Sequence, residues 1–177
     1  AEFYGRINHG KNSEYYIISD SIDTKYNNFL GHFLHGLKLK SYEFNKYKSK
    51  KETRLILVNV IGKKNKPSEK NQLKFKALEA GTFYARDLVS EPGNVLHPDE
   101  YANRLNSLRK DGLKINIYDD KKLKKLGMHA LLGVGQGSVR GSYLVTMEWN
   151  GAKNNSKPLA FVGKGVCFDT GGYSLKP

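Results

Sequence analysis

Three charged residues stand in a glycine-rich stretch at residues 163–177, GKGVCFDTGGYSLKP. The charged residues are Lys164, Asp169 and Lys176, and the glycines among them are Gly163, Gly165, Gly171 and Gly172. Glycine lets a backbone approach a ligand closely or adopt positive φ. A lone Asp between lysines most often forms a solvated ion pair of little energetic weight. The density of glycine argues against that interpretation, because an ordinary surface ion pair needs no such backbone freedom.

Two nucleotide-binding motifs do not fit the glycine-rich parts of this sequence. A phosphate-binding loop needs GxxxxGK followed by Ser or Thr, whereas Gly165 and Val166 follow Lys164. The GVGQG run at residues 133–137 lacks the GxGxxG spacing of a dinucleotide-binding turn, and no strong helix pattern follows it. We therefore assign no nucleotide-binding site.

The end of the chain closely resembles a known metal-site segment. VGKGVCFDTGGYSLKP (162–177) matches the pattern VGKGxxFDxGGxxLKP of the leucyl aminopeptidase (cytosol aminopeptidase) family, the dinuclear-metal M17 peptidases. Upstream, residues 85–102 are similar to that family's entry into its catalytic domain, and residues 127–138 to a shared segment before its metal-binding strands. Residues 31–48 are similar to the helix and hairpin that close its N-terminal domain. The resemblance covers about residues 29–177.

The resemblance implies a role for each charged residue of the glycine-rich stretch. Lys164 would bind one of two divalent metal ions, Mn²⁺ or Zn²⁺, through a neutral amine, a form that burial and a nearby dication both favour. Asp169 would bridge the two metals with its two carboxylate oxygens. Lys176 would be the catalytic residue that stays charged and stabilises the oxyanion, while the metals activate the attacking water. We interpret Cys167 as a small buried apolar residue rather than as a nucleophile.

The resemblance also implies metal ligands that the sequence does not contain. In the family they lie in an NTDAEGR-like segment and at one further Asp, whereas this sequence ends at Pro177. One Lys and one Asp cannot hold two metals, because each needs about four ligands. The histidines do not substitute for them: His32 and His35 are three residues apart, and no HxxxH or HExxH pair occurs. We expect an internal fragment that is inactive by itself.

The elements that must position these residues alternate between strand and helix patterns. We expect strands at residues 14–20, 54–60, 113–119, 143–149 and 158–163, and helices at residues 21–39, 73–90, 97–112 and, shorter, 120–127. The run at 54–60 is continuously apolar, as in a strand buried on both faces. The order predicts an α/β fold.

Two of the expected helices carry specific signals. The helix at 73–90 has an apolar stripe that we expect to be buried, made of Leu73, Ala77, Ala80, Tyr84 and Leu88, widened by Phe75, Leu78 and Val89. The helix at 97–112 has Pro98 at its first position and Gly112 at its C-terminal end. Asp119 or Asp120 can cap the short lysine-rich helix.

The domain organisation follows from these elements and from the resemblance. Residues 1–61 would be the later part of an N-terminal α/β domain, and residues 62–90 a polar connector followed by a linking helix. Residues 91–177 would begin an α/β catalytic domain with a mixed sheet. The resemblance further implies a homohexamer at full length and peptide substrates with a free N-terminus.

The net charge of +13 raises a second hypothesis, a basic α/β module that binds nucleic acid. The excess is concentrated at residues 38–76, which hold 13 basic and 3 acidic residues. Tyr42, Phe44 and Tyr47 lie among these lysines, as in a stacking surface. We favour the alternative that the aromatic side chains are buried and the lysines solvated. Charge that is spread over a surface is better evidence of solubility than of a particular binding partner.

Composition narrows the cellular setting. A single cysteine, Cys167, excludes an intramolecular disulfide framework and a CxxC motif, and a reducing cytoplasm is the simplest interpretation. No stretch approaches the roughly 20 apolar residues that a membrane span needs. The first ten residues show no charged-then-apolar signal pattern.

Overall fold

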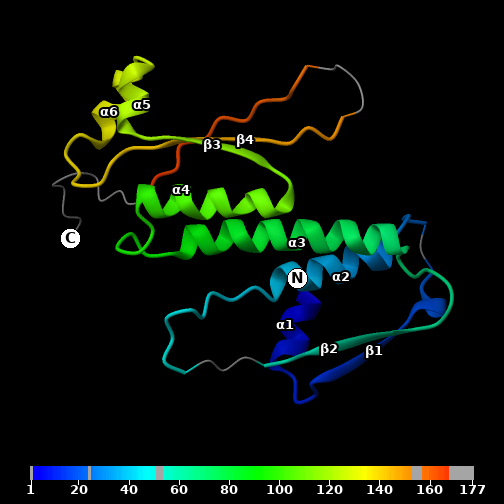
Figure 1. Ribbon diagram of the computed structural model, residues 1–177. Coiled ribbons are helices and arrows are strands. Elements are labelled where there is room, and N and C mark those ends of the chain that lie inside the picture. Colours follow the sequence, from blue (N-terminus) through cyan, green and yellow to red (C-terminus); the bar gives the residue numbers. More distant parts are fainter. Residues whose placement is uncertain (1, 24, 51–53, 153–156, 168–177) are drawn as a thin grey trace. The chain divides into compact units, whose positions relative to one another are not determined.

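The computed structural model describes residues 2–23, 25–50, 54–152 and 157–167. The chain divides into two compact units, Ala1–Ser90 and Glu91–Pro177. Both units combine helices with a short pair of strands, which confirms the predicted α/β class (Figure 1). None of the described helices is long and apolar enough to cross a lipid bilayer.

The first unit is built around a strand–helix–strand arrangement. Its elements are α1 (Glu2–His9), β1 (Glu14–Ile18), the 3₁₀ turn η1 (Ser19–Ser21), α2 (Phe29–Lys40), β2 (Leu57–Ile61) and α3 (Glu69–Ser90). Strands β1 and β2 pair in parallel, with Tyr16 opposite Asn59. Parallel neighbours need a crossover connection, which contains α2 here. Helix α2 packs along α3 (Figure 1).

The core of the first unit lies between its helices. Ile7 of α1, Leu30 and Leu37 of α2 and Phe75 of α3 are its buried apolar residues in the described part. Helix α2 begins at Phe29 rather than at Ser21, because Asn28 has the left-handed φ of 55° and the backbone cannot be helical through it.

The predicted stripe of α3 is only partly buried. Phe75 is buried as predicted, against the rings of His32 and His35, whereas Leu73 is 60% exposed and Val89 86% exposed. A two-residue offset turns a helix by about 200°, so choosing Phe75 as the contact places Leu73 opposite α2. Aromatic stacking with α2 decided between two apolar faces that the sequence pattern could not rank.

The apolar run at 54–60 is also less buried than predicted. Only residues 57–60 of the run lie in β2, whose Leu57 and Ile61 are 50% and 52% exposed. On β1, Tyr16 and Ile18 are each 59% exposed. One face of the two-stranded sheet is therefore open in the described part of the chain. A parallel sheet is normally covered on both faces, which is why the sequence run suggested burial.

The second unit places helices beside an antiparallel strand pair. Its elements are α4 (Pro98–Asn106), the 3₁₀ segment η2 (Ser107–Asp111), β3 (Lys114–Tyr118), α5 (Asp120–Lys125), α6 (His129–Gly135) and β4 (Leu144–Glu148). Strands β3 and β4 pair antiparallel, with Ile115 opposite Met147. The buried core includes Leu96, Ala102, Ile115 and Leu123.

Several local predictions for the second unit are confirmed. Pro98 starts α4, and Gly112 ends η2 with a φ of +90°. The Asp119 carboxylate accepts a hydrogen bond of 2.9 Å from the Lys122 amide and caps α5. Gly133 and Gly135 of the GVGQG run lie inside α6.

Candidate functional site

The segment that carries Lys164 is irregular, and the strand predicted at 158–163 is not formed. Leu159, Phe161 and Val162 are 81%, 90% and 100% exposed. An apolar strand is stable only when a neighbouring strand takes up its backbone hydrogen bonds, and in the described residues β4 pairs with β3 alone. Lys164 is likewise exposed.

The segment meets the folded unit at Gly165, beside the ring of Tyr101. A Cβ added at Gly165 would lie 2.7 Å from Cε1 and 3.3 Å from Cδ1 of Tyr101, too close for a carbon atom. Tyr101 belongs to the first turns of α4, and Figure 1 shows the red end of the described chain beside the beginning of that helix. Glycine at 165 therefore permits a close approach that any side chain would prevent.

A charged pair holds the neighbouring loop at the same end of α4. Arg140 Nη1 donates to Asp99 Oδ2 over 3.1 Å, and Asp99 Oδ1 also accepts from the Glu100 amide. Partial burial opposes ionisation of Asp99, but the Glu100 amide and the Arg140 guanidinium together lower its pKa. Burial raises the pKa of the Cys167 thiol, and the Asp99 carboxylate adds to the rise. Cys167 is thus mainly protonated near neutral pH, as a packing residue would be.

A second ionic group ties α4 to the residues before it. Arg104 Nη1 donates to Glu91 Oε2 and Arg104 Nε to Glu100 Oε1, both over 2.7 Å. Glu91 is 7% exposed, so the pair with Arg104 is largely removed from water. These hydrogen bonds to Glu91 and Glu100 raise the pKa of Arg104. The ion pair of Arg104 with Glu91 therefore holds α4, the helix that carries Tyr101, to the residues that precede it.

The other two predicted site residues, Asp169 and Lys176, lie outside the described residues. Lys164 is thus the one predicted metal ligand whose position is described, and no group of three or more His, Cys, Asp or Glu residues suited to a metal occurs in the described part. The amine of Lys164 has suitable donor chemistry, but a single donor is short of the roughly four that a divalent metal needs. The described residues alone do not make a metal site.

His32 and His35 both pack against helix α3. His35 Nδ1 lies 2.9 Å from Glu79 Oε1, and its ring stacks on Phe75 at 4.8 Å between centroids. The His32 ring meets the same phenylalanine edge-on at 5.1 Å. Both rings serve the contact between α2 and α3.

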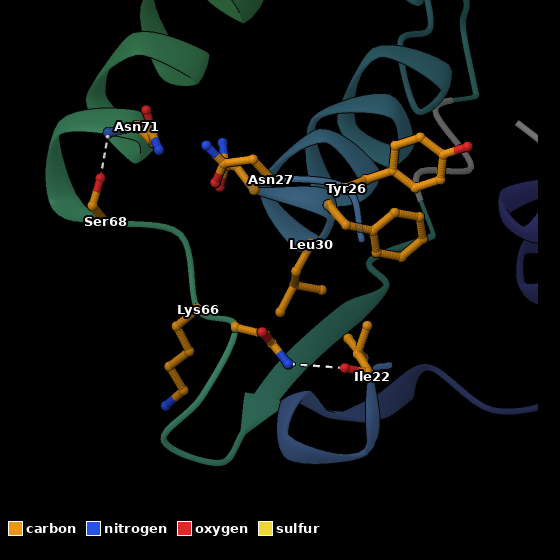
Figure 2. Close-up of a pocket in the computed structure, with 10 residues that line it drawn as sticks. Ile22, Tyr26, Asn27, Leu30, Lys66, Ser68 and Asn71 are labelled. Atoms are coloured by element: carbon orange, nitrogen blue, oxygen red, sulfur yellow. Dashed lines mark hydrogen bonds between the residues drawn. The ribbon is translucent and has the colours of Figure 1, made fainter. Parts of the chain in front are cut away.

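A pocket in the first unit lies apart in sequence from the glycine-rich stretch. It has a volume of about 260 Å³ between the beginnings of α2 and α3 (Figure 2). Its lining is mostly amide and hydroxyl side chains, with Asn27 and Asn71 pointing toward one another across the opening. The Asn65 amide is already used, donating to the carbonyls of Ser19 and Ile22.

The aromatic residues of the basic stretch are partly used in packing. Tyr42 donates to Asp87 Oδ1 over 2.7 Å, and its ring packs on Phe83 with centroids 5.2 Å apart. Phe44 is half-buried, whereas Tyr47 is 54% exposed. Burial of Tyr42 and Phe44 supports the interpretation that these rings stabilise the unit rather than form an open stacking surface.

Sequence reasoning missed the partners of the glycine-rich segment. Nothing in the spacing of Tyr101 and Gly165 indicates that the ring lies where a side chain at position 165 would be. One signal was available: the i, i+4 spacing of Glu100 and Arg104 predicts their ion pair. Glu91 lies before the beginning of α4, so no helical spacing predicts its pair with Arg104.

Comparison with known proteins places these residues in a wider family. Residues 83–177 match the model of the cytosol aminopeptidase family, catalytic domain. A probable cytosol aminopeptidase of Agrobacterium fabrum is 47% identical over 151 residues, which cover 82% of this chain and 30% of that protein. The chain therefore spans about a third of the length of the curated relatives it matches.

Solved structures show the same fold. The cytosol aminopeptidase from Coxiella burnetii matches with a TM-score of 0.69 at 20% identity, over 86% of this chain and 31% of that one. The bottromycin maturation enzyme BotP in complex with Mn matches with a TM-score of 0.66 at 22% identity, over 83% of this chain and 32% of that one.

Proposed function

The chain belongs to the cytosol aminopeptidase family, and we propose that its protein is a metal-dependent aminopeptidase that releases N-terminal residues from peptides. The observation that carries the proposal is the segment VGKGVCFDTGGYSLKP, which falls inside the family match at residues 83–177. The manganese in the structure of BotP, a protein of similar fold, supports a metal requirement.

Two divalent ions, Mn²⁺ or Zn²⁺, would supply Lewis-acid chemistry and an activated water at neutral pH. Lys164 would hold one ion through a neutral amine. Asp169 would hold the ions through its carboxylate. The remaining ligands would come from parts of the relatives that this chain does not span.

Lys176 has a different task, because a charged ammonium is a poor metal ligand and a good partner for an oxyanion. It would stay protonated and donate to the oxygen that becomes negative when water attacks the carbonyl. Removal of one such donor typically costs about 100- to 1,000-fold in kcat. The substrate's free α-amine would bind at the same centre, which restricts cleavage to the N-terminal residue.

The wider setting of the activity follows the family. We propose a cytoplasmic enzyme that acts on peptides and assembles as a homohexamer at full length. These statements extend the family assignment to a whole protein of the relatives' length. The curated relatives are about three times as long as this chain.

The proposal is tested with the full-length protein and leucine amide as substrate. Turnover should require Mn²⁺ or Zn²⁺, cease with a chelator and be absent for the N-acetylated substrate. Asp169→Ala should lower metal-dependent kcat by at least about 100-fold, because it removes a metal ligand, and loss of residues that only orient such ligands already costs about 10- to 100-fold. Asp111→Ala, which removes a carboxylate from η2, is the matched control. Metal-dependent turnover that survives Asp169→Ala unchanged would overturn the assigned roles.

A further inference from the structure

We propose that Tyr101 is a positioning residue for Lys164: its ring supports the backbone of Gly165 and thereby fixes where the lysine amine can reach. The inference rests on the proposed function, because it assigns Tyr101 a consequence for metal binding. Tyr101 itself touches neither metal nor substrate in this proposal.

The Tyr101 ring occupies the space that a side chain at position 165 would need. A Cβ at Gly165 would lie 2.7, 3.3 and 3.8 Å from Cε1, Cδ1 and Cζ of Tyr101. Positive φ occurs at Gly62, Gly112 and Gly127 among the described glycines, and not at Gly165. Backbone conformation therefore does not demand glycine at 165. The ring does, since it occupies the space that a side chain would need.

The residues before Lys164 do not fix its position. Leu159, Phe161 and Val162 are at least 81% exposed, so this part of the segment makes little contact with the described unit. The Tyr101 ring lies next to Gly165, directly after the lysine, and Cys167 two residues further along is half-buried. The first firm support for Lys164 in the described chain is thus the beginning of α4.

Tyr101 is itself firmly held. Its amide donates to the His97 carbonyl over 2.8 Å, which places it in the first complete turn of α4. Asp99 and Arg140 brace the same turn from one side, and Arg104 ties it to buried Glu91. An aromatic ring has few rotatable bonds, so it makes a rigid support once its backbone is fixed.

Support of this kind matters because lysine is flexible. Ordering its side chain costs up to about 2 kcal/mol of conformational entropy, and a loosely held backbone adds to that cost. Residues that orient metal ligands from behind typically change metal affinity about 10- to 100-fold when removed. Loss of the Tyr101 ring should therefore weaken metal binding without removing any ligand.

The test uses the full-length protein, Mn²⁺ alone as the probe, and a cycle of variants at both contact partners. Tyr101→Phe keeps the ring carbons that meet Gly165 and should bind Mn²⁺ within twofold of wild type. Tyr101→Ala and Gly165→Ala should each weaken Mn²⁺ binding at least tenfold. The double variant should be no weaker than the weaker single variant, since residues in contact are not additive.

A second readout needs no metal. The alkylation rate of Cys167, followed on its peptide by mass spectrometry, reports how firmly residues 165–167 are held. The rate should rise severalfold in Tyr101→Ala and stay at the wild-type value in Tyr101→Phe. Tyr118→Ala, which removes a half-buried tyrosine from β3, is the control for general loss of packing. It should change neither Mn²⁺ affinity nor alkylation by more than twofold.

Each outcome decides the matter. Unchanged Mn²⁺ affinity and alkylation in Tyr101→Ala, or losses that add in the double variant, would overturn the positioning role. A wild-type protein that binds no Mn²⁺ would contradict the proposed function instead, while the alkylation rates still decide the contact. If Tyr101→Ala does not fold, Gly165→Ala in the wild-type and Tyr101→Leu backgrounds tests the same contact from the other side.

Discussion

Arg104 joins two carboxylates with one side chain. Its Nη1 reaches Glu91 and its Nε reaches Glu100, both over 2.7 Å, in a fork that only a guanidinium provides. The Glu91 side chain is almost fully buried. A buried carboxylate is tolerated only while it is paired. Removing Arg104 would leave the Glu91 charge buried and uncompensated, which costs more free energy than the pair itself contributes.

We expect Arg104→Ala to destabilise the second unit by about 3 kcal/mol, the scale measured when one partner of a buried pair is removed. Arg104→Lys should recover only part of the loss, because an ammonium cannot reproduce the fork. Chemical denaturation followed by the fluorescence of Trp149, the single tryptophan, measures both variants.

The matched control is Lys114→Ala, since Lys114 and Glu148 form an ion pair whose side chains are 72% and 58% exposed. Its loss should cost no more than about 1 kcal/mol, as is usual for exposed pairs. Equal effects of Arg104→Ala and Lys114→Ala would contradict the importance of burial at Glu91.

Connections between elements depend on a few backbone positions. Gly112 ends η2 at φ +90°, and a Cβ there would come within 3.2 Å of the Trp149 ring. Gly133, by contrast, lies inside α6 with no atom within 4 Å of an added Cβ. The two glycines therefore serve opposite purposes, one required by its turn and one a weak point in its helix.

Gly112→Ala should destabilise the second unit by about 1–2 kcal/mol, because a non-glycine residue in the left-handed region is strained. Gly133→Ala should stabilise it by up to about 1 kcal/mol through better helix propensity. Thermal unfolding of the two variants, followed by Trp149, gives both signs in one experiment. A loss of stability in Gly133→Ala would contradict the claim that Gly133 is a weak point in α6.

The loop that enters α3 is held by a carboxylate from the end of β1. Asp20 Oδ1 accepts from the amides of Lys64 and Lys63 over 2.6 and 2.8 Å, and these two bonds lower the pKa of Asp20. Asp20 thereby ties the β1 end of the parallel pair to the residues that follow β2.

The lowered pKa fixes the sign of a pH effect. Because the folded pKa lies below the unfolded value of about 3.9, Asp20 stabilises the first unit above that pH and loses its effect as the pH falls through the folded pKa. Asp20→Asn should lower the unfolding temperature at pH 7 and flatten its decline below about pH 4. Circular dichroism melts across this range test it. A variant with the same acid dependence as wild type would remove Asp20 from the explanation.

The whole molecule carries +13, and the structure offers a plain account of the excess. Tyr42 and Phe44 of the basic stretch are half-buried, so the lysines around them project from a packed surface. Charge of this kind favours solubility and does not by itself define a partner.

Neutralising Lys46, Lys48, Lys50 and Lys51 to Gln should therefore leave peptide hydrolysis within twofold of wild type. The variant and the wild type should also associate equally with single-stranded DNA at every salt concentration between about 50 and 200 mM. Fluorescence anisotropy with a labelled oligonucleotide measures the second quantity. Binding that falls steeply with salt in wild type and vanishes in the variant would favour the nucleic-acid hypothesis instead.

The sequence alone determined whatever depends on neighbours along the chain. The α/β class, the Pro98 and Gly112 ends, the Asp119 cap and the family of the last segment were all predicted, because turns, caps and motifs are set by residue types at short spacing. Tertiary structure decided which apolar face is used. Phe75 rather than Leu73 packs on α2, because a partner's shape selects among faces of equal hydrophobicity.

Tertiary structure also decided the surroundings of Lys164. The strand expected at 158–163 is not formed, because hydrogen bonds of a sheet come from a partner strand and cannot be read from the strand itself. Conversely, the Tyr101 ring meets Gly165 across 64 positions of sequence, a distance at which no local pattern carries information. The residue types predicted the chemistry, whereas the position of Gly165 beside the Tyr101 ring came only from the tertiary structure.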